Sequence, residues 1–229
     1  MIPLRDANPR ATTPVITVLL IVANVAIFLY QISLPPRAEA QFVLALGMVP
    51  ARLQLALTSP QVSLQDAAFP LLSSMFLHGG WLHVIGNMWF LWVFGDNVED
   101  RLGHFRFLFF YLAAGSAAGL IHTFFNWGST VPTVGASGAV SAVLGAYFVF
   151  FPGARVVTLV PLLFFFFTVQ LPAAVILGWW LLLQFLSGVE SLGTRAVGGV
   201  AWWAHIGGFI AGMIFARLLR PRRAAYRYH

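Results

Sequence analysis

The chain alternates between long apolar runs and short polar segments. A helix of roughly 20 mostly apolar residues is long enough to cross a bilayer. Six stretches approach or exceed this length, near residues 13–32, 71–94, 105–126, 137–151, 156–186 and 200–219. The pattern predicts an all-α, polytopic membrane protein, a six-transmembrane-helix bundle that forms one domain over residues 1–229, with short tails at 1–12 and 220–229.

The fourth apolar run is unusually short. Pro132 and Gly135 precede it and the pair Pro152-Gly153 ends it, which leaves about 15 residues of helix. An interior helix shorter than the membrane has to begin below one surface, at the bottom of a cavity that water can reach. Ser137 is predicted to lie at this N-terminus.

The sequence also predicts the location or role of three other segments. The longest connection, Ser33 to Pro70, is predicted to be an external loop that lies partly in the membrane interface. The charged stretch from Gly95 to Gly103 is predicted to be a capped turn between the second and third spans. The fifth run, with Phe164 to Phe167 and Trp179-Trp180, is predicted to contact lipid and to carry no chemistry.

Composition agrees with a membrane protein, since 59% of the residues are hydrophobic and only 9% are charged. Six spans place both termini on one side. That side would hold ten of the 13 arginines, which predicts that both termini are cytoplasmic. The net charge of +6 is concentrated after the last apolar run, which favours contact with anionic lipid over binding of nucleic acid. The first run is long for a signal sequence and is predicted to be a retained helix.

Several hydrolytic chemistries are disfavoured by the residues available. The chain has no cysteine, and its acidic residues fall in predicted tails, loops or span ends, which argues against an aspartyl site. The histidines lack the spacing of a zinc protease helix, so no metal or cofactor is expected. A serine or threonine hydroxyl activated by a neutral imidazole remains.

Ser137 and His205 are the best candidates for that pair. Ser137 stands between small residues where the chain turns into a helix, so backbone N–H groups beside its hydroxyl are free to stabilise an oxyanion. Small residues at four-residue spacing would let the fourth and sixth spans touch closely enough for proton transfer. These stripes are Ala204, Gly208 and Gly212 on the last span, and Gly138, Ala142 and Gly145 or Ala146 on the fourth.

The second span adds possible donors. His83 and Asn87 are four residues apart, so they share a helix face and could both donate to a developing negative charge, together with the Ser137 backbone N–H. No carboxylate is placed to orient His205, so the sequence predicts a dyad and a slow enzyme. Each residue also has an ordinary packing interpretation, which we favour for His78 and His122 and for the pair Glu99 and Arg101.

Taken together, the ordered motifs resemble the rhomboid intramembrane proteases. They are the segment His83 to Asn87, the segment Gly135 to Gly138, and Ala204-His205 with the glycines that follow. The segments Met1 to Asp6 and Glu99 to Gly103 are similar to bacterial members, so the likeness extends over nearly the whole chain.

The resemblance implies that Ser137 is the nucleophile, His205 the general base, and His83, Asn87 and the Ser137 N–H the oxyanion site. It implies single-span membrane protein substrates that approach beside the second and fifth spans, and cleavage after a small residue near the external end of the substrate helix. Two features depart from the family pattern. Ser141 replaces an aromatic that often supports the histidine, and the first loop lacks a Trp-Arg pair.

The sequence argues against two other functions. A catalytically silent relative would bind membrane helices, although such relatives usually lack the serine or the histidine. A small-solute transporter or channel would show inverted repeats or charged midplane helices, and the sequence shows neither. The compact architecture suggests a prokaryotic plasma membrane, and the sequence does not indicate the oligomeric state.

Overall fold

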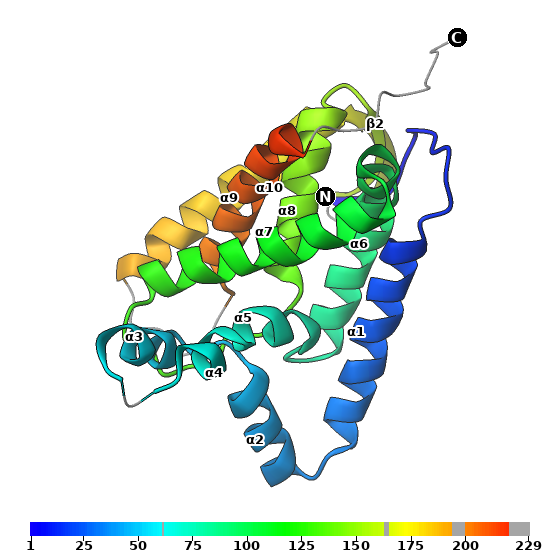
Figure 1. The fold of residues 1–229 in the computed structure, drawn as a ribbon. Helices are drawn as coiled ribbons and strands as arrows, with labels where there is room; N and C mark the ends of the chain where they lie inside the picture. Colours follow the sequence, from blue (N-terminus) through cyan, green and yellow to red (C-terminus); the bar gives the residue numbers. More distant parts are fainter. Residues whose placement is uncertain (61, 163–164, 194–199, 220–229) are drawn as a thin grey trace.

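The computed structural model of the protein describes residues 1–60, 62–162, 165–193 and 200–219. Long helices pack side by side, and shorter helices gather at one end of the bundle (Figure 1). The predicted class, a mostly helical membrane protein, is confirmed. The predicted C-terminal tail, 220–229, lies outside the described residues. The principal helices are α1 (Val15–Ser33), α6 (Trp81–Leu102), α7 (His104–Phe125), α8 (Ser137–Phe150), α9 (Ala173–Gly193) and α10 (Trp202–Leu218).

Helix length alone does not establish six spans. In the part of the chain that the structure describes, three helical segments are long and apolar enough to cross a membrane: α1, α7 and Ala173–Ser191 of α9. A fourth is obtained if the helices of Leu64–Phe76 and Trp81–Leu102, which are bent by 82°, count as one span. Helix α8 has 14 residues and α10 has 17. The number six therefore stays a prediction.

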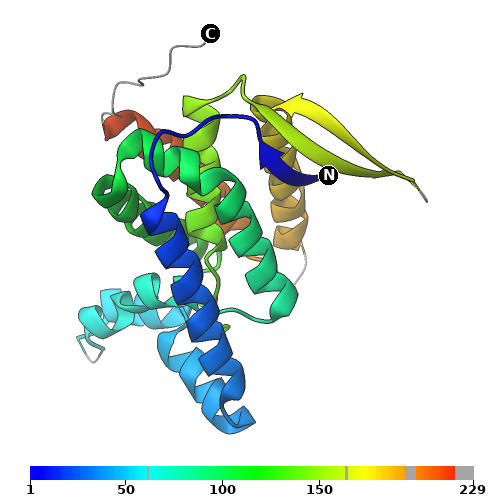
Figure 2. The same ribbon diagram turned by 90° about the vertical axis from the view of Figure 1, so that its right-hand side faces the viewer.

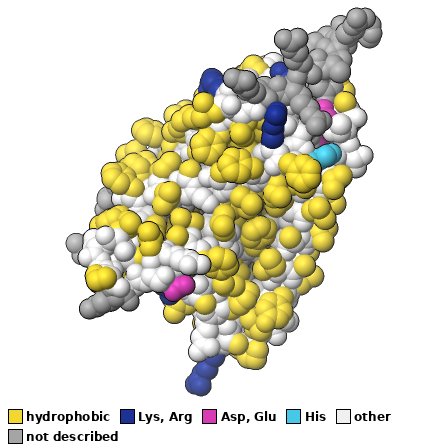
Figure 3. Space-filling view, viewed as in Figure 1, with side chains coloured by type: hydrophobic (Ala, Val, Ile, Leu, Met, Phe, Trp, Pro, Cys, Tyr) yellow, Lys and Arg dark blue, Asp and Glu magenta, His cyan; other side chains and the backbone are white. Residues whose placement is uncertain are grey.

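The protein is an integral membrane protein, and its surface agrees with that. Hydrophobic side chains cover most of the face shown in Figure 3, and the arginines visible there lie near its upper and lower ends. Large apolar side chains are almost fully exposed along the helices, including Leu82 at 88% and Phe105 at 89%. Patches of this extent are unfavourable in water and are suited to lipid.

The predicted external loop consists mainly of short helices at the end of the bundle drawn lowest in Figure 1. Prolines begin three of them, where the missing N–H costs no helical bond. A helical backbone satisfies most of its own polar groups, as an interfacial location requires. Its association with lipid remains a prediction. The elements are α2 (Pro36–Leu46), α3 (Pro50–Thr58), α4 (Leu64–Ala68), α5 (Pro70–Ser73) and the 3-10 turn η1 (Ser74–Phe76).

The second long helix is displaced from its predicted position. Instead of a span over 71–94 and a capped turn over 95–103, α6 continues to Leu102 and the chain turns only at Gly103, where φ is 83°. The predicted turn was wrong because its polar side chains bond to other parts of the chain, so the helix continues through them. Glu99, for example, is fully buried.

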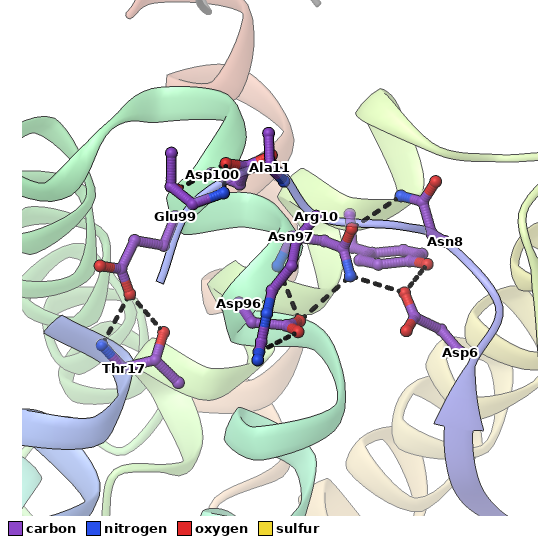
Figure 4. Close-up of polar contacts among 11 residues, drawn as sticks. Asp6, Asn8, Arg10, Ala11, Thr17, Asp96, Asn97, Glu99 and Asp100 are labelled. Carbon is purple, nitrogen blue, oxygen red and sulfur yellow. Dashed lines mark hydrogen bonds and ion pairs between the residues drawn. The ribbon is translucent and has the colours of Figure 1, made fainter. Parts of the chain in front are cut away.

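Glu99 caps the first helix. Oε2 of its carboxylate accepts hydrogen bonds from the backbone N–H and the hydroxyl of Thr17, both at 2.7 Å (Figure 4). Oε1 accepts from the Ile16 N–H at 2.9 Å and lies 2.5 Å from His104 Nδ1. The residue before α1 is Pro14, which provides no side-chain cap. Glu99 therefore supplies both the acceptor and the negative charge that a helix N-terminus favours.

The predicted N-terminal tail, residues 1–12, forms an arm that packs against the bundle. Its backbone follows the end of α6, where Thr12 N–H donates to Asp100 at 2.9 Å and Arg10 forms an ion pair with Asp96 at 3.1 Å (Figure 4). Asp6 accepts hydrogen bonds from the Tyr147 hydroxyl at 2.6 Å and the Asn97 amide at 2.8 Å. The arm thereby ties α6 to the far end of α8.

A small antiparallel sheet corrects the fifth predicted span. Strands β1 (Ile2–Asp6), β2 (Arg155–Leu162) and β3 (Phe165–Pro172) lie in that order, and β2 and β3 form a hairpin that projects from the bundle (Figure 2). The helix of this region begins only at Ala173. The preceding residues are rich in β-branched and aromatic types, and Pro161 cannot donate inside a helix. Phe164 lies outside the described residues.

The arm should make stability depend on pH. Burial raises the pKa of the Asp6 carboxyl from 3.8 to about 6, and the nearby Asp96 acts in the same direction. The folded protein then binds this proton more tightly than the unfolded chain does, so the contribution to stability is complete below about pH 4 and is lost as the pH rises through about 6. We expect Tm in detergent to fall by a few degrees across this window, and less in Asp6→Asn.

Exposed Asp66 provides the matched control, because Asp66→Asn should keep the wild-type pH dependence. An Asp6→Asn profile that follows the wild-type profile would show that this carboxyl does not titrate on unfolding.

Helices α8 and α10 touch through their backbones. A Cβ atom added at Gly208 would overlap the carbonyl oxygen of Gly138, and one at Gly212 would overlap that of Ala142. The contact is also made from α8 toward α10, because a Cβ at Gly145 would overlap the carbonyl of Phe209. The predicted matching stripes of small residues are confirmed, and they bring the helices of Ser137 and His205 together.

Candidate active site

A cavity of about 890 Å³ lies where α6, α8 and α10 begin and where α7 and α9 end. The four residues predicted to form the site, His83, Asn87, Ser137 and His205, all line it, although they lie far apart in the sequence. Ser141 and Trp180 also contribute to its wall. The fold thus gathers the predicted polar residues in one space.

Ser137 is the first residue of α8, as predicted. The segment before it is fastened to the rest of the protein. Gly135 N–H donates to the carbonyl of Ser74 at 2.9 Å, and Met48 and Thr133 exchange backbone bonds of 3.0 and 2.8 Å. Because the first N–H groups of a helix have no partner within the helix, the backbone at Ser137 can donate into the cavity.

Gly135 permits the imidazole of His83 to approach this turn. Its φ of 124° is rarely adopted by other residues, and a Cβ there would lie 2.6 Å from Nε2 of His83. Ser137 Oγ lies 3.7 Å from the position that this Cβ would occupy. Nδ1 of His83 accepts from Gly79 N–H at 3.3 Å, so its proton is on Nε2. The His83 ring can therefore donate a hydrogen bond beside the serine.

Asn87 lies one turn further along α6. Its side chain is buried, with 7% of the residue exposed, yet its Nδ2 has no hydrogen-bond partner among the described residues. A buried amide donor without a partner is costly, and such groups are frequently functional. Here the donor belongs to a residue that lines the cavity, as an oxyanion site requires.

His205 is oriented from α9. Its Nδ1 lies 2.7 Å from Oε1 of Gln184, so Nδ1 carries the proton and Nε2 keeps a lone pair. The ring of Trp180 lies 6.0 Å from the imidazole, tilted by 32°. Within the described part of the chain no hydrogen bond joins His205 to Ser137, although both line the cavity on touching helices. Catalytic hydrogen bonds are often long before substrate binds.

The residues that hold His205 were missed from the sequence. The fifth span was expected to carry only lipid-facing bulk, whereas Gln184 and Trp180 both contact the imidazole. The sequence contains a signal for Gln184, because a side-chain amide in an otherwise apolar helix needs a hydrogen-bond partner.

Ser141 has a structural reason to be small. Its Cβ lies 3.2 Å from the position that a Cβ of Gly208 would occupy, so a larger side chain would separate α8 from α10. Its hydroxyl donates to the Ser137 carbonyl at 2.6 Å. The aromatic support expected near the histidine comes from Trp180 instead.

His122, for which a packing role is predicted, lines the cavity and also bonds to the segment before α8. Its Nε2 lies 3.1 Å from the Thr133 hydroxyl, and this contact links α7 to the segment that leads into α8.

These features define a class: an integral membrane protein whose helices enclose a cavity lined by a serine, an oriented histidine and hydrogen-bond donors. The sequence model of one family, the Rhomboid domain, matches residues 65–222. The chain belongs to the rhomboid family.

Curated relatives carry the same family name. RHOMBOID-like protein 4 of Arabidopsis thaliana is 31% identical over 88% of this chain and 52% of its own length. RHOMBOID-like protein 5 of that plant is 30% identical over 66% of this chain and 45% of its own. The human presenilin-associated rhomboid-like protein, mitochondrial, is 36% identical over 34% of this chain and 21% of its own.

The chain thus spans about half the length, or less, of these relatives. Being plant and mitochondrial proteins, they do not support the prediction of a prokaryotic plasma membrane.

Proposed function

We propose that this protein is an intramembrane serine endopeptidase that cleaves single-span membrane proteins with a Ser137–His205 dyad. The observation that carries the proposal is the state of His205. Its Nδ1 proton is engaged by Gln184, which leaves the lone pair of Nε2 to act as a base in the cavity that Ser137 also lines. Family membership supports the same chemistry.

Acylation would begin when Ser137 Oγ attacks the carbonyl carbon of the scissile peptide bond and passes its proton to Nε2 of His205. The carbonyl oxygen then becomes an oxyanion. Nε2–H of His83, the amide of Asn87 and the Ser137 backbone N–H are the donors proposed to bind it. Collapse of the intermediate breaks the C–N bond, and the imidazolium returns the proton to the leaving amine.

Deacylation would repeat these steps with water as the nucleophile. His205 takes a proton from water as the water oxygen attacks the acyl carbon. The tetrahedral intermediate then collapses, the bond from that carbon to Ser137 Oγ breaks, and the imidazolium returns the proton to Oγ. Gln184 is an uncharged partner, so it stabilises the imidazolium less than the carboxylate of a triad does. A slow enzyme is therefore expected.

We further propose that the substrate helix approaches beside α6 and α9 and is cut after a small residue near its external end. Both termini of the enzyme would be cytoplasmic. Large apolar side chains exposed on both helices, such as Trp89 on α6 and Leu183 on α9, support an approach through lipid.

The test uses purified protein in detergent with a tagged single-span substrate and a fluorophosphonate probe that reacts with activated serines. Wild type should cleave the substrate and become labelled. Ser137→Ala and His205→Ala should each lose cleavage by about 10⁴-fold or more, and Ser137→Ala should not be labelled.

Ser116→Ala is the matched control, because the Ser116 hydroxyl bonds to the Leu112 carbonyl within α7 and does not line the cavity. It should retain wild-type activity. If folded wild type neither cleaves several substrates nor labels, the protease proposal is overturned in favour of a silent protein that binds membrane helices.

A further inference from the structure

The hydrogen bond that orients the imidazole of His205 comes from a neighbouring helix, while Trp202 of its own helix places its ring 6.2 Å away. Gln184 accepts the Nδ1 proton of His205 at 2.7 Å, and Trp180, one turn earlier on α9, places its ring 6.0 Å away. Gln184 is buried, with 8% of the residue exposed, and it is absent from the wall of the cavity. Its amide therefore reaches the imidazole and not the space in which a substrate would bind.

This contact selects one tautomer. A neutral imidazole carries its proton on either nitrogen, and the tautomer with the proton on Nε2 has no lone pair to accept a proton from Ser137. An acceptor on Nδ1 stabilises the opposite tautomer and fixes the ring plane. The amide oxygen of Gln184 does both without adding a buried charge.

The charged and titratable groups around His205 come from several helices. His83 on α6 and His122 on α7 line the cavity together with it. Glu190 on α9 lines the same cavity, whereas α8 contributes the hydroxyls of Ser137 and Ser141 to this wall. Among the described residues, Gln184 is the side chain that bonds to Nδ1.

We infer that Gln184 is a positioning residue for the general base: it fixes the tautomer and orientation of His205 and makes the activity of the base depend on the place of α9. The inference rests on the proposed protease function. It assigns to the fifth long helix a part in catalysis that the serine and histidine motifs do not contain.

The test compares Gln184→Leu and Gln184→Glu with wild type. Leucine removes the acceptor, so kcat should fall about 10- to 100-fold while KM stays near the wild-type value, as for other outer partners of a functional histidine. Glutamate keeps an acceptor and adds charge, so it should restore most of kcat. Because a carboxylate stabilises the imidazolium, the acid limb of the labelling rate against pH should move to higher pH.

Two controls separate the possible failures. Gln170→Leu, on the exposed strand β3, makes the same chemical change far from His205 and should leave kcat unchanged. Gln184→Met, similar in shape, replaces Gln184→Leu if that variant does not fold. Histidine ¹⁵N shifts read the tautomer directly, and the Nδ1–H signal of His205 should weaken in the leucine or methionine variant.

A folded leucine or methionine variant with full kcat and an unchanged tautomer would overturn the role of Gln184. So would a folded glutamate variant as inactive as the leucine one. A wild type without Ser137-dependent labelling would instead refute the protease function, and the tautomer measurement would still report on the contact.

Discussion

Gly208→Ala should cost about 3 kcal/mol or more of stability and abolish the activity that wild type shows. The added methyl group would overlap the carbonyl oxygen of Gly138 and come within 3.2 Å of the Ser141 side chain. Overpacking a well-packed core costs about 1–3 kcal/mol when side chains can shift. Here the obstacle is the backbone of the facing helix, so α8 and α10 must separate, and Ser137 moves away from His205.

Gly178→Ala is the matched control, since a Cβ at Gly178 meets no atom within 4 Å. It should be neutral or slightly stabilising, because alanine is the better helix former. Thermal unfolding in detergent and probe labelling measure both variants. Equal Tm values for Gly208→Ala and wild type would mean that α8 and α10 are not in backbone contact.

Glu99→Ala should destabilise the protein by about 3–5 kcal/mol, because each buried donor left without an acceptor costs about 1–3 kcal/mol. The variant loses the acceptor for two N–H groups and one hydroxyl of α1 and leaves these donors buried. Glu99→Gln keeps an amide oxygen but no charge, so its loss should be intermediate. Both effects should appear as lowered Tm in detergent.

Asp66→Ala controls for the removal of an acid, because Asp66 is exposed on α4. It should change Tm by no more than the scatter between preparations. A Glu99→Ala variant as stable as wild type would show that α1 begins without this cap.

The parts of the site predicted correctly from the sequence depend on local signals. Proline and glycine around the fourth run fixed the start of α8 at Ser137, because these residues restrict the backbone wherever they occur. The small-residue stripes predicted the contact of α8 with α10, because four-residue spacing defines one helix face. The i, i+4 spacing of His83 and Asn87 placed both on the cavity side of α6.

The parts that were wrong or missed depend on partners distant in the sequence. The polar residues at the end of α6 resembled a turn, because nothing local shows that Glu99 caps a helix 82 residues earlier. The apolar run after Arg155 resembled a span, because its pairing with Ile2–Asp6 is equally remote. The role of Gln184 depends on the packing of α9 against His205, which the local sequence does not indicate.

The backbone contact between α8 and α10 has a mechanical consequence. Each glycine at this contact leaves space for one carbonyl oxygen of the facing helix. The two helices therefore fit together only at certain positions along their axes, and they cannot slide past each other in small steps. Nucleophile and base consequently travel as one rigid body. Any widening of the cavity to admit a substrate helix has to come from α6, α7 or α9. The backbones that carry Ser137 and His205 are thus already in place when the substrate arrives, and only their side chains have to close into a hydrogen bond.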